Sequence, residues 1–436
     1  MMQALPSLLI ASLVLFPLMA AGVQVGVVLA LAGMAGSAYL VGGWQGAVAL
    51  PLIQSLDVTG SYTLMVIPLF IAMGSIAERS GITTDLFLAF YRWFGHIRGG
   101  IGVATIMTCA GMSSITGSSL AVSASMSKIA LPELRRYRYD DRLSLGSIAV
   151  GGTLAIMIPP SITLVLYAIF ASQSVGQMLI AGILPGVLLT ALYLLKIVVR
   201  CHLTPRLGPG GPRHSLAERM ESLWKVVPFF SIVTVIILGM LLGVWTPTEA
   251  AATGLVLVML LGLMRRKLTL RLALDAALEA VIVSASIMLV VIGSLIFSNF
   301  VAMTGVSTKL ADFIISLQLS PFSLFSLFVL VYLVLGMFLE ATSILALTVP
   351  LALPIAVATG WDPVWFGVIL VCLMEVAAIT PPVGLNLFVM KASIPGVTLH
   401  SIYMGAMPFC VVNVIVVFIL YVFPDIALLL PTMMSR

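Results

Sequence analysis

A long uncharged stretch constrains the fold of this chain more than any other feature. No charged residue occurs from Leu143 through Leu195, and other long uncharged runs recur along the 436 residues. One membrane-spanning helix needs only about 20 apolar residues. Charged residues make up 8% of the chain, whereas soluble domains contain roughly 25%. The sequence therefore predicts an all-α polytopic membrane protein, with roughly 11 transmembrane helices of that length.

Two consecutive prolines interrupt this uncharged stretch. Pro159 and Pro160 lie within GTLAIMIPPSI, residues 152–162. A proline inside a helix removes a backbone hydrogen bond and clashes with the preceding turn, at a cost of about 3 kcal/mol. The residue before each proline is also pushed away from helical geometry. The motif therefore predicts a transmembrane helix that is broken at 151–162.

The segment at about 99–131 is predicted to fold back on itself as a first hairpin. Basic residues flank it on both sides, at Arg98 and in the cluster at 135–142. A single straight span would place these flanks in opposite compartments, against the positive-inside rule. Two apolar arms joined at the polar tip SSITGSS, residues 113–119, would keep both flanks cytoplasmic. The alternative is a single helix with a polar packing face.

The second part of the chain repeats this pattern with different charges. Residues 313–361 contain one charge, Glu340, within LGMFLEATS. We expect a second hairpin at about 321–355, which enters from outside because its flanks lack arginine. A second Pro-Pro pair follows in AAITPPVGLNL and predicts a second broken helix at 377–387. A hairpin followed by a broken helix in each half, with inverted charge flanks, indicates an inverted-repeat transporter.

A hydrophilic linker separates these two halves. We predict a first membrane half at 1–199, a cytoplasmic linker at 200–225 and a second membrane half at 226–436. The linker is rich in Gly, Pro and basic residues. Its last part, SLAERMESLWK, is predicted to form a short surface helix with Ser215 as its N-cap.

The remaining charge and the reactive side chains exclude several classes of function. The excess of 21 Lys and Arg over 16 Asp and Glu fits loops on the inner face of a membrane. No basic stripe with interleaved aromatic residues suggests nucleic-acid binding. The four cysteines form no CxxC motif and the four histidines show no metal-ligand spacing. We therefore expect no zinc, no disulfides, no organic cofactor and no enzyme activity.

The broken helices and hairpin tips supply candidate ligands for Na⁺. A helix break at membrane depth leaves backbone carbonyls without partners, and these can join Ser, Thr and Asn oxygens around a cation. The bland alternative is that these small residues only pack helices together. The Na⁺ candidates are Ser114, Thr116, Gly117, Ser118, Ser119, Gly152, Thr153, Gly336, Thr342, Ser343, Thr380 and Gly384.

The same segments supply candidate contacts for an anionic substrate. Half-helix N-termini present N–H groups and a positive dipole end to an anion. Glu340 is the exception among these candidates, because its carboxyl would attract a cation. The substrate candidates are Ser118, Pro159, Pro160, Ser161, Glu340, Pro381, Pro382 and Asn386.

Two further acids lie in apolar surroundings. An acid within a membrane is costly and is a candidate functional residue by default. For Glu375, the structural and functional readings remain open. For Glu249, in WTPTEAAATG, we favour a structural role at a helix start, with Thr246 or Thr248 as the cap and Pro247 in the first turn.

At these segments the sequence resembles the large membrane subunit of TRAP transporters, the tripartite ATP-independent periplasmic transporters of the DctM type. The likeness runs in order over nearly the whole chain, and the paired IPPS and TPPVG segments are its most specific part. It is carried by YTLMVIPLFIAMGSIAERSGI (62–82), TGSSLAVSASMSKIALPELRRYRYD (116–140), GGTLAIMIPPSI (151–162), QSVGQMLIAGILPG (173–186), GVWTPTEAAA (243–252), LGMFLEATSILALTVPLALPI (335–355) and FGVILVCLMEVAAITPPVGLNLFV (366–389).

The resemblance implies an elevator-type importer in the inner membrane of a bacterium. It also implies two protein partners, a small membrane subunit of the DctQ type and a periplasmic substrate-binding protein of the DctP type. The implied activity is Na⁺-driven uptake of a carboxylate such as a C4-dicarboxylate or sialic acid. The sodium-site regions of the family fall on the two hairpin tips and the two Pro-Pro segments.

Two other functions compete with this reading. A one-component Na⁺/anion symporter of the same superfamily would need no binding protein. An intramembrane serine hydrolase would use Ser118 or Ser119 as nucleophile, and it would need a nearby histidine as base. No histidine lies in an apolar segment near either serine.

Overall fold

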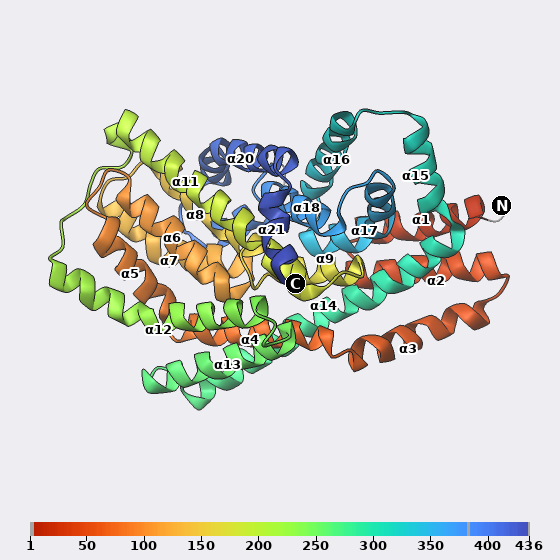
Figure 1. The fold of residues 1–436 in the computed structure, drawn as a ribbon, viewed down its shortest axis with the longest axis horizontal. Helices are drawn as coiled ribbons and strands as arrows, with labels where there is room; N and C mark the ends of the chain where they lie inside the picture. Colours follow the sequence, from red (N-terminus) through yellow and green to blue (C-terminus); the bar gives the residue numbers. More distant parts are fainter. Residues whose placement is uncertain (1–3, 382–383, 435–436) are drawn as a thin grey trace.

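The computed structural model describes residues 4–381 and 384–434, and these residues fold almost entirely into helices (Figure 1). No strand occurs in these two ranges. The prediction of an all-α polytopic membrane protein is confirmed. By length and composition, the described helices include 6 that can cross a membrane, or up to 8 if each of two bent pairs counts as one span. Several more apolar helices are only 10–17 residues long, because turns and breaks divide the apolar runs that the sequence counts as spans.

The first half of the chain contains short helices joined by tight turns. In chain order its elements are α1 (Ala4–Ala20), α2 (Val25–Val41), α3 (Trp44–Gly60), η1 (Thr63–Met65), α4 (Val66–Arg79), α5 (Ile82–Phe94), α6 (Gly100–Thr116), α7 (Ser119–Arg136), α8 (Asp141–Met157), α9 (Ile162–Phe170), α10 (Val175–Ala181), α11 (Ile183–Leu203) and η2 (Pro205–Leu207).

The second half begins with three long helices. Its elements are α12 (Leu216–Leu241), α13 (Pro247–Met264), α14 (Leu270–Thr304), α15 (Val306–Ser316), α16 (Pro321–Gly336), α17 (Ala341–Ala358), α18 (Pro363–Ala378), α19 (Leu385–Ser393), α20 (Leu399–Val422) and α21 (Asp425–Met434).

Two groups of helices organise the molecule. In the first group, α14 packs along α2, α3 and α4, and α4 packs against α13. In the second group, α8 packs against α6, α7, α18 and α20. Figure 1 shows α1, α2 and α3 beside α14 at one end of the long axis, and α6, α7 and α8 at the other. We call the first group the frame and the second group the core group.

Glycines allow the helices of the frame to touch through their backbones. A Cβ placed on Gly293 of α14 would lie 1.9 Å from the Gly26 carbonyl oxygen of α2. A Cβ placed on Gly26 would in turn lie 2.5 Å from the Leu289 carbonyl oxygen. Small residues at helix contacts are typical of membrane proteins, where close van der Waals packing drives association. The α2–α14 pair is therefore a rigid contact.

Two predicted helix caps are confirmed, although one helix differs from its prediction. The Ser215 hydroxyl accepts from the Glu218 backbone N–H, and the Glu218 carboxylate accepts from the Ser215 N–H at 2.8 Å. The helix that follows is not a separate surface helix, because it continues without interruption to Leu241 as α12. Thr246 and Glu249 form the same reciprocal cap at the start of α13, with Pro247 in its first turn. Glu249 thus has the structural role that the sequence favours.

Candidate functional site

The chain reverses direction between α6 and α7, where the sequence predicts the first hairpin. α6 extends to Thr116, so the turn consists of only Gly117 and Ser118. Gly117 has φ +57°, a conformation that favours glycine. The Ser118 hydroxyl caps α7 by accepting from the Ala121 N–H at 3.3 Å. The alternative of a single continuous helix is wrong, and the polar tip is shorter than the predicted 113–119.

Four residues of the predicted tip, 113–116, therefore lie in the last turn of α6. The hydroxyl of Ser114 donates to the Gly111 carbonyl at 2.6 Å. The hydroxyl of Thr116 donates to the Met112 carbonyl at 3.1 Å. A hydroxyl that donates to its own helix still has lone pairs with which to accept or to bind a cation.

A break follows between α8 and α9, where the sequence predicts the first broken helix. The two helices are bent by 41° across residues 158–161, and the Pro159–Pro160 peptide is cis. Ser161 caps α9 by accepting from the Leu164 N–H at 3.3 Å, and its hydroxyl donates to the Ile156 carbonyl. We call residues 158–161 the first break.

The first hairpin presses directly against the first break and against α8. A Cβ on Gly117 would lie 2.8 Å from the Pro160 carbonyl oxygen. A Cβ on Gly152 of α8 would lie 1.8 Å from the Ser123 hydroxyl oxygen of α7. Thr153 turns its hydroxyl to the Val150 carbonyl at 2.9 Å. These glycines permit the close contact that holds the first tip in place.

A second turn joins α16 to α17, where the sequence predicts the second hairpin. α17 begins after Glu340, whose side chain does not cap the helix and instead accepts from the Thr342 hydroxyl at 2.9 Å. Ser343 is buried in the first turn of α17. A Cβ on Gly336 would lie 2.1 Å from the Ala377 Cβ, so the second hairpin packs tightly against α18.

A second break follows between α18 and α19, where the sequence predicts the second broken helix. α18 ends at Ala378, and Gly384 with φ +60° precedes α19. Thr380 donates to the Val376 carbonyl at 2.6 Å. Pro381 lies at the end of the described range, and Pro382 lies outside the described residues. We call the interval between α18 and α19 the second break; its described residues are 379–381 and 384.

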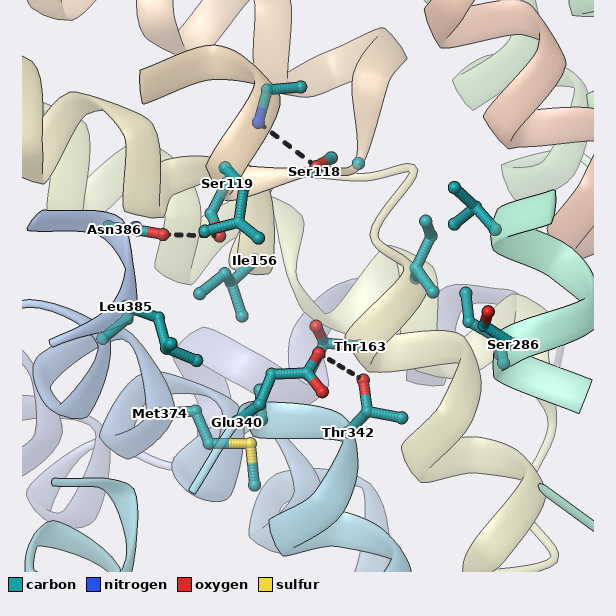
Figure 2. Close-up of a pocket in the computed structure, with 18 of the residues that line it drawn as sticks. Ser118, Ser119, Ile156, Thr163, Ser286, Glu340, Thr342, Met374, Leu385 and Asn386 are labelled. Carbon is teal, nitrogen blue, oxygen red and sulfur yellow. Dashed lines mark hydrogen bonds between the residues drawn. The ribbon is translucent and has the colours of Figure 1, made fainter. Parts of the chain in front are cut away.

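One hydrogen bond joins the first hairpin to the helix after the second break. The Ser119 hydroxyl donates to the Asn386 side-chain oxygen at 3.2 Å (Figure 2). Asn386 is 1% exposed, and its side-chain nitrogen has no hydrogen-bond partner among the described residues. Two segments 267 positions apart in sequence thus meet at one place.

The two tips and the helix after the second break line a single cavity of about 440 Å³. The residues predicted as site residues that line this cavity are Thr116, Gly117, Ser118, Ser119, Gly336, Glu340, Thr342, Gly384 and Asn386. The other predicted site residues within the described ranges are not among the residues that line this cavity: Ser114, Gly152, Thr153, Pro159, Pro160, Ser161, Ser343, Thr380 and Pro381.

The frame supplies the opposite wall of the cavity, which sequence reasoning missed. Ser75 and Glu78 of α4 and Glu279 of α14 line it, together with Gln24 and Ser286. Glu279 accepts from Ser75 at 2.6 Å and pairs with Arg79 at 2.9 Å. The available signal was two glutamates, Glu78 and Glu279, next to long apolar runs.

The cavity is acidic. Glu78, Glu279 and Glu340 line it, and its described lining contains no Lys, Arg or His. Glu78 accepts from the Ser125 hydroxyl of α7, which links the frame to the first hairpin. The donor set of hydroxyl, amide, carboxylate and backbone oxygens suits a hard cation.

These features define a class of protein, a membrane transporter in which paired hairpins and helix breaks enclose a solute-sized cavity. The profile of one family, "Tripartite ATP-independent periplasmic transporter, DctM component", matches residues 12–426. The chain belongs to this family and is a TRAP transporter large permease subunit rather than an enzyme.

Named relatives agree with this assignment. The chain is 32% identical to the C4-dicarboxylate TRAP transporter large permease protein DctM of Pseudomonas aeruginosa, over 87% of this chain and 88% of the relative. It is 31% identical to the sialic acid TRAP transporter large permease protein SiaM of Vibrio cholerae, again over 87% and 88%. The solved YdaH transporter of Alcanivorax borkumensis has a similar fold, with a TM-score of 0.58 at 13% identity over 90% of this chain and 89% of that one.

Proposed function

We propose that this subunit imports a small organic acid into a bacterial cell together with Na⁺. In this proposal the subunit lies in the inner membrane and works with a DctQ-type small membrane subunit. A DctP-type periplasmic binding protein delivers the solute. Na⁺ is the coupling ion, and the transport core moves by an elevator mechanism.

One observation carries the proposal: tips and helix starts from both halves converge on one acidic cavity between the core group and the frame. An anionic solute would be repelled by Glu78, Glu279 and Glu340 unless positive charge entered with it. Arg79 offsets only Glu279. Na⁺ bound at the tips and breaks would supply the missing positive charge.

The helix starts of the second half supply a place for the solute carboxylate. α7 and α9 are capped by serine hydroxyls, whereas the described structure shows no side-chain cap on α17 or α19. Uncapped helix N-termini present backbone N–H groups and a positive dipole end to anions. The unpartnered nitrogen of Asn386 adds a donor beside α19. We therefore place the carboxylate at Asn386 and the start of α19.

The names of relatives suggest which solute to test. One relative is named for C4-dicarboxylates and another for sialic acid, and both acids carry the carboxylate that this site requires. We propose that the solute of this chain is one of these acids or a similar carboxylate.

Reconstitution in liposomes tests the proposal. Radiolabelled succinate and sialic acid are the probes, with the cognate small subunit and binding protein supplied. We expect uptake that requires an inward Na⁺ gradient and all three proteins. Equal uptake when K⁺ replaces Na⁺ would reject the coupling. Uptake without the binding protein would instead favour a one-component Na⁺/anion symporter.

A further inference from the structure

A second polar group lies inside the core group and outside the cavity described above. Glu375 is in the last turn of α18, just before the second break, and it is 1% exposed. Neither of its carboxyl oxygens has a hydrogen-bond partner among the described residues. It is not among the cavity-lining residues, although its neighbours Met374 and Ala377 are.

A buried tyrosine of α11, Tyr193, lies within electrostatic range of this carboxyl. The Tyr193 hydroxyl of α11 donates to the Asn413 side-chain oxygen of α20. The Asn413 nitrogen is buried and has no described partner.

The titratable groups on the neighbouring helices do not neutralise Glu375. Its electrostatic neighbours are the Tyr193 hydroxyl and the Cys372 thiol, which are uncharged at neutral pH. The two lysines on the surrounding helices have partners of their own: Lys196 of α11 donates to the Pro408 carbonyl and lies over the Phe409 ring, and Lys391 of α19 donates to the Val397 carbonyl. The tyrosines and the cysteine are also engaged. Tyr167 of α9 donates to the Pro363 carbonyl, Tyr332 of α16 donates to the Thr348 hydroxyl, and the Cys410 thiol of α20 contacts the Thr380 hydroxyl.

An ionised carboxylate in this position would be severely destabilising. A buried charge needs a counter-ion and hydrogen bonds, and without them the group takes up a proton instead. The Tyr193 hydroxyl already donates its proton to Asn413, so it does not neutralise Glu375. A proton needs no cage of oxygens, so it fits these surroundings better than Na⁺ does.

We propose that Glu375 is a proton-binding site of the transport core. The carboxylate takes one proton from water to form a neutral carboxylic acid, and it keeps that proton in the conformation described here. Glu375 is not one of the Na⁺ candidates, and the proposal stands whether or not the solute assignment is correct.

Infrared spectroscopy of the purified full-length subunit tests this proposal without any solute. We expect a carboxylic-acid C=O band at neutral pH that disappears in Glu375→Gln, a variant of nearly the same shape. Glu279→Gln is the matched control, because Glu279 is paired with Arg79 and half-exposed. That variant should keep the band. Identical acid bands in wild type and Glu375→Gln would overturn the proposal, as would a carboxylate band of Glu375 that shifts when K⁺ replaces Na⁺.

The pH dependence of stability provides a second, independent measurement. A folded state that holds a proton which the unfolded chain releases becomes less stable as the pH rises above the ordinary range of a glutamate. For one proton, the unfolding constant of wild type should rise up to tenfold per pH unit relative to Glu375→Gln. Parallel pH profiles of the two proteins would contradict the assignment.

Discussion

The two halves of this permease contribute similar elements to the cavity, but among the described residues only the first half caps the helices after its hairpin tip and its break with side chains. In the first half, Ser118 and Ser161 accept from backbone N–H groups and close the starts of α7 and α9. In the second half, α17 and α19 begin at Glu340 and Gly384, which provide no side-chain cap.

In the proposed function, this difference gives the two halves different roles in binding. At a capped start the serine hydroxyl satisfies one of the backbone N–H groups of the first turn and holds the start in place, while its second lone pair can bind a cation. An uncapped start keeps backbone donors for an anion. We therefore expect the first half to be the more rigid and the second half to respond more strongly to the solute.

The largest expected effect contrasts Gly117 at the first tip with Gly384 at the second break. Gly117→Leu should reduce uptake to the level of empty liposomes, because both its φ of +57° and the Pro160 carbonyl oxygen, 2.8 Å from a Cβ, oppose a side chain. Gly384→Leu should reduce uptake less: its φ of +60° is similar, but its nearest obstacles, the Leu387 side chain at 3.2 Å and the Thr380 carbonyl oxygen at 3.3 Å, lie farther from a Cβ. Uptake assays on variants that insert normally provide the measurement.

Gly360→Leu is the control for backbone strain alone. Its φ is +84°, yet nothing lies within 4 Å of a Cβ there. It should retain most of the uptake. Wild-type uptake in Gly117→Leu would show that the first tip is not held against the first break.

A smaller effect tests the anion site of the second half. Asn386→Asp keeps the shape of the side chain, removes the unpartnered donor and adds a negative charge. A hydrogen bond to a charged group contributes about 1.5–3 kcal/mol, so the KM for the solute should rise at least tenfold. Ser286→Ala, on the opposite wall of the cavity, should leave the KM near the wild-type value. An unchanged KM in Asn386→Asp would show that the solute carboxylate does not bind at Asn386.

The smallest effect concerns stability. Ser161→Ala removes the cap of α9 and should lower the free energy of unfolding by about 1 kcal/mol. Thr342→Ala, at the uncapped start of α17, removes only a hydroxyl that donates to Glu340, and it should cost less. Denaturant titration in detergent gives both values. Equal losses of unfolding free energy in the two variants would show that the capping difference between the halves does not affect stability.

Much of the fold was readable from local chemistry. Pro159 and Pro160 lie at the first break, Pro381 lies at the second, and the Thr246–Glu249 spacing gives a reciprocal cap. The length of the first tip was not readable, because Ser and Thr also suit the end of a helix by donating to carbonyls one turn back, as Ser114 does. The linker helix was predicted to be short because its first turns are charged. The structure shows that the same helix continues into the apolar sequence and ends at Leu241.

The sequence by itself determined the helical membrane architecture, the two hairpins and the two breaks, since proline, glycine and charge act on their own neighbourhood along the chain. Only the tertiary structure decided which of these residues face one cavity, and it added Glu78 and Glu279 from the frame. It also decided that Glu375 is enclosed without a counter-charge. Burial and the identity of partners depend on helices hundreds of residues apart, and no local pattern encodes those contacts.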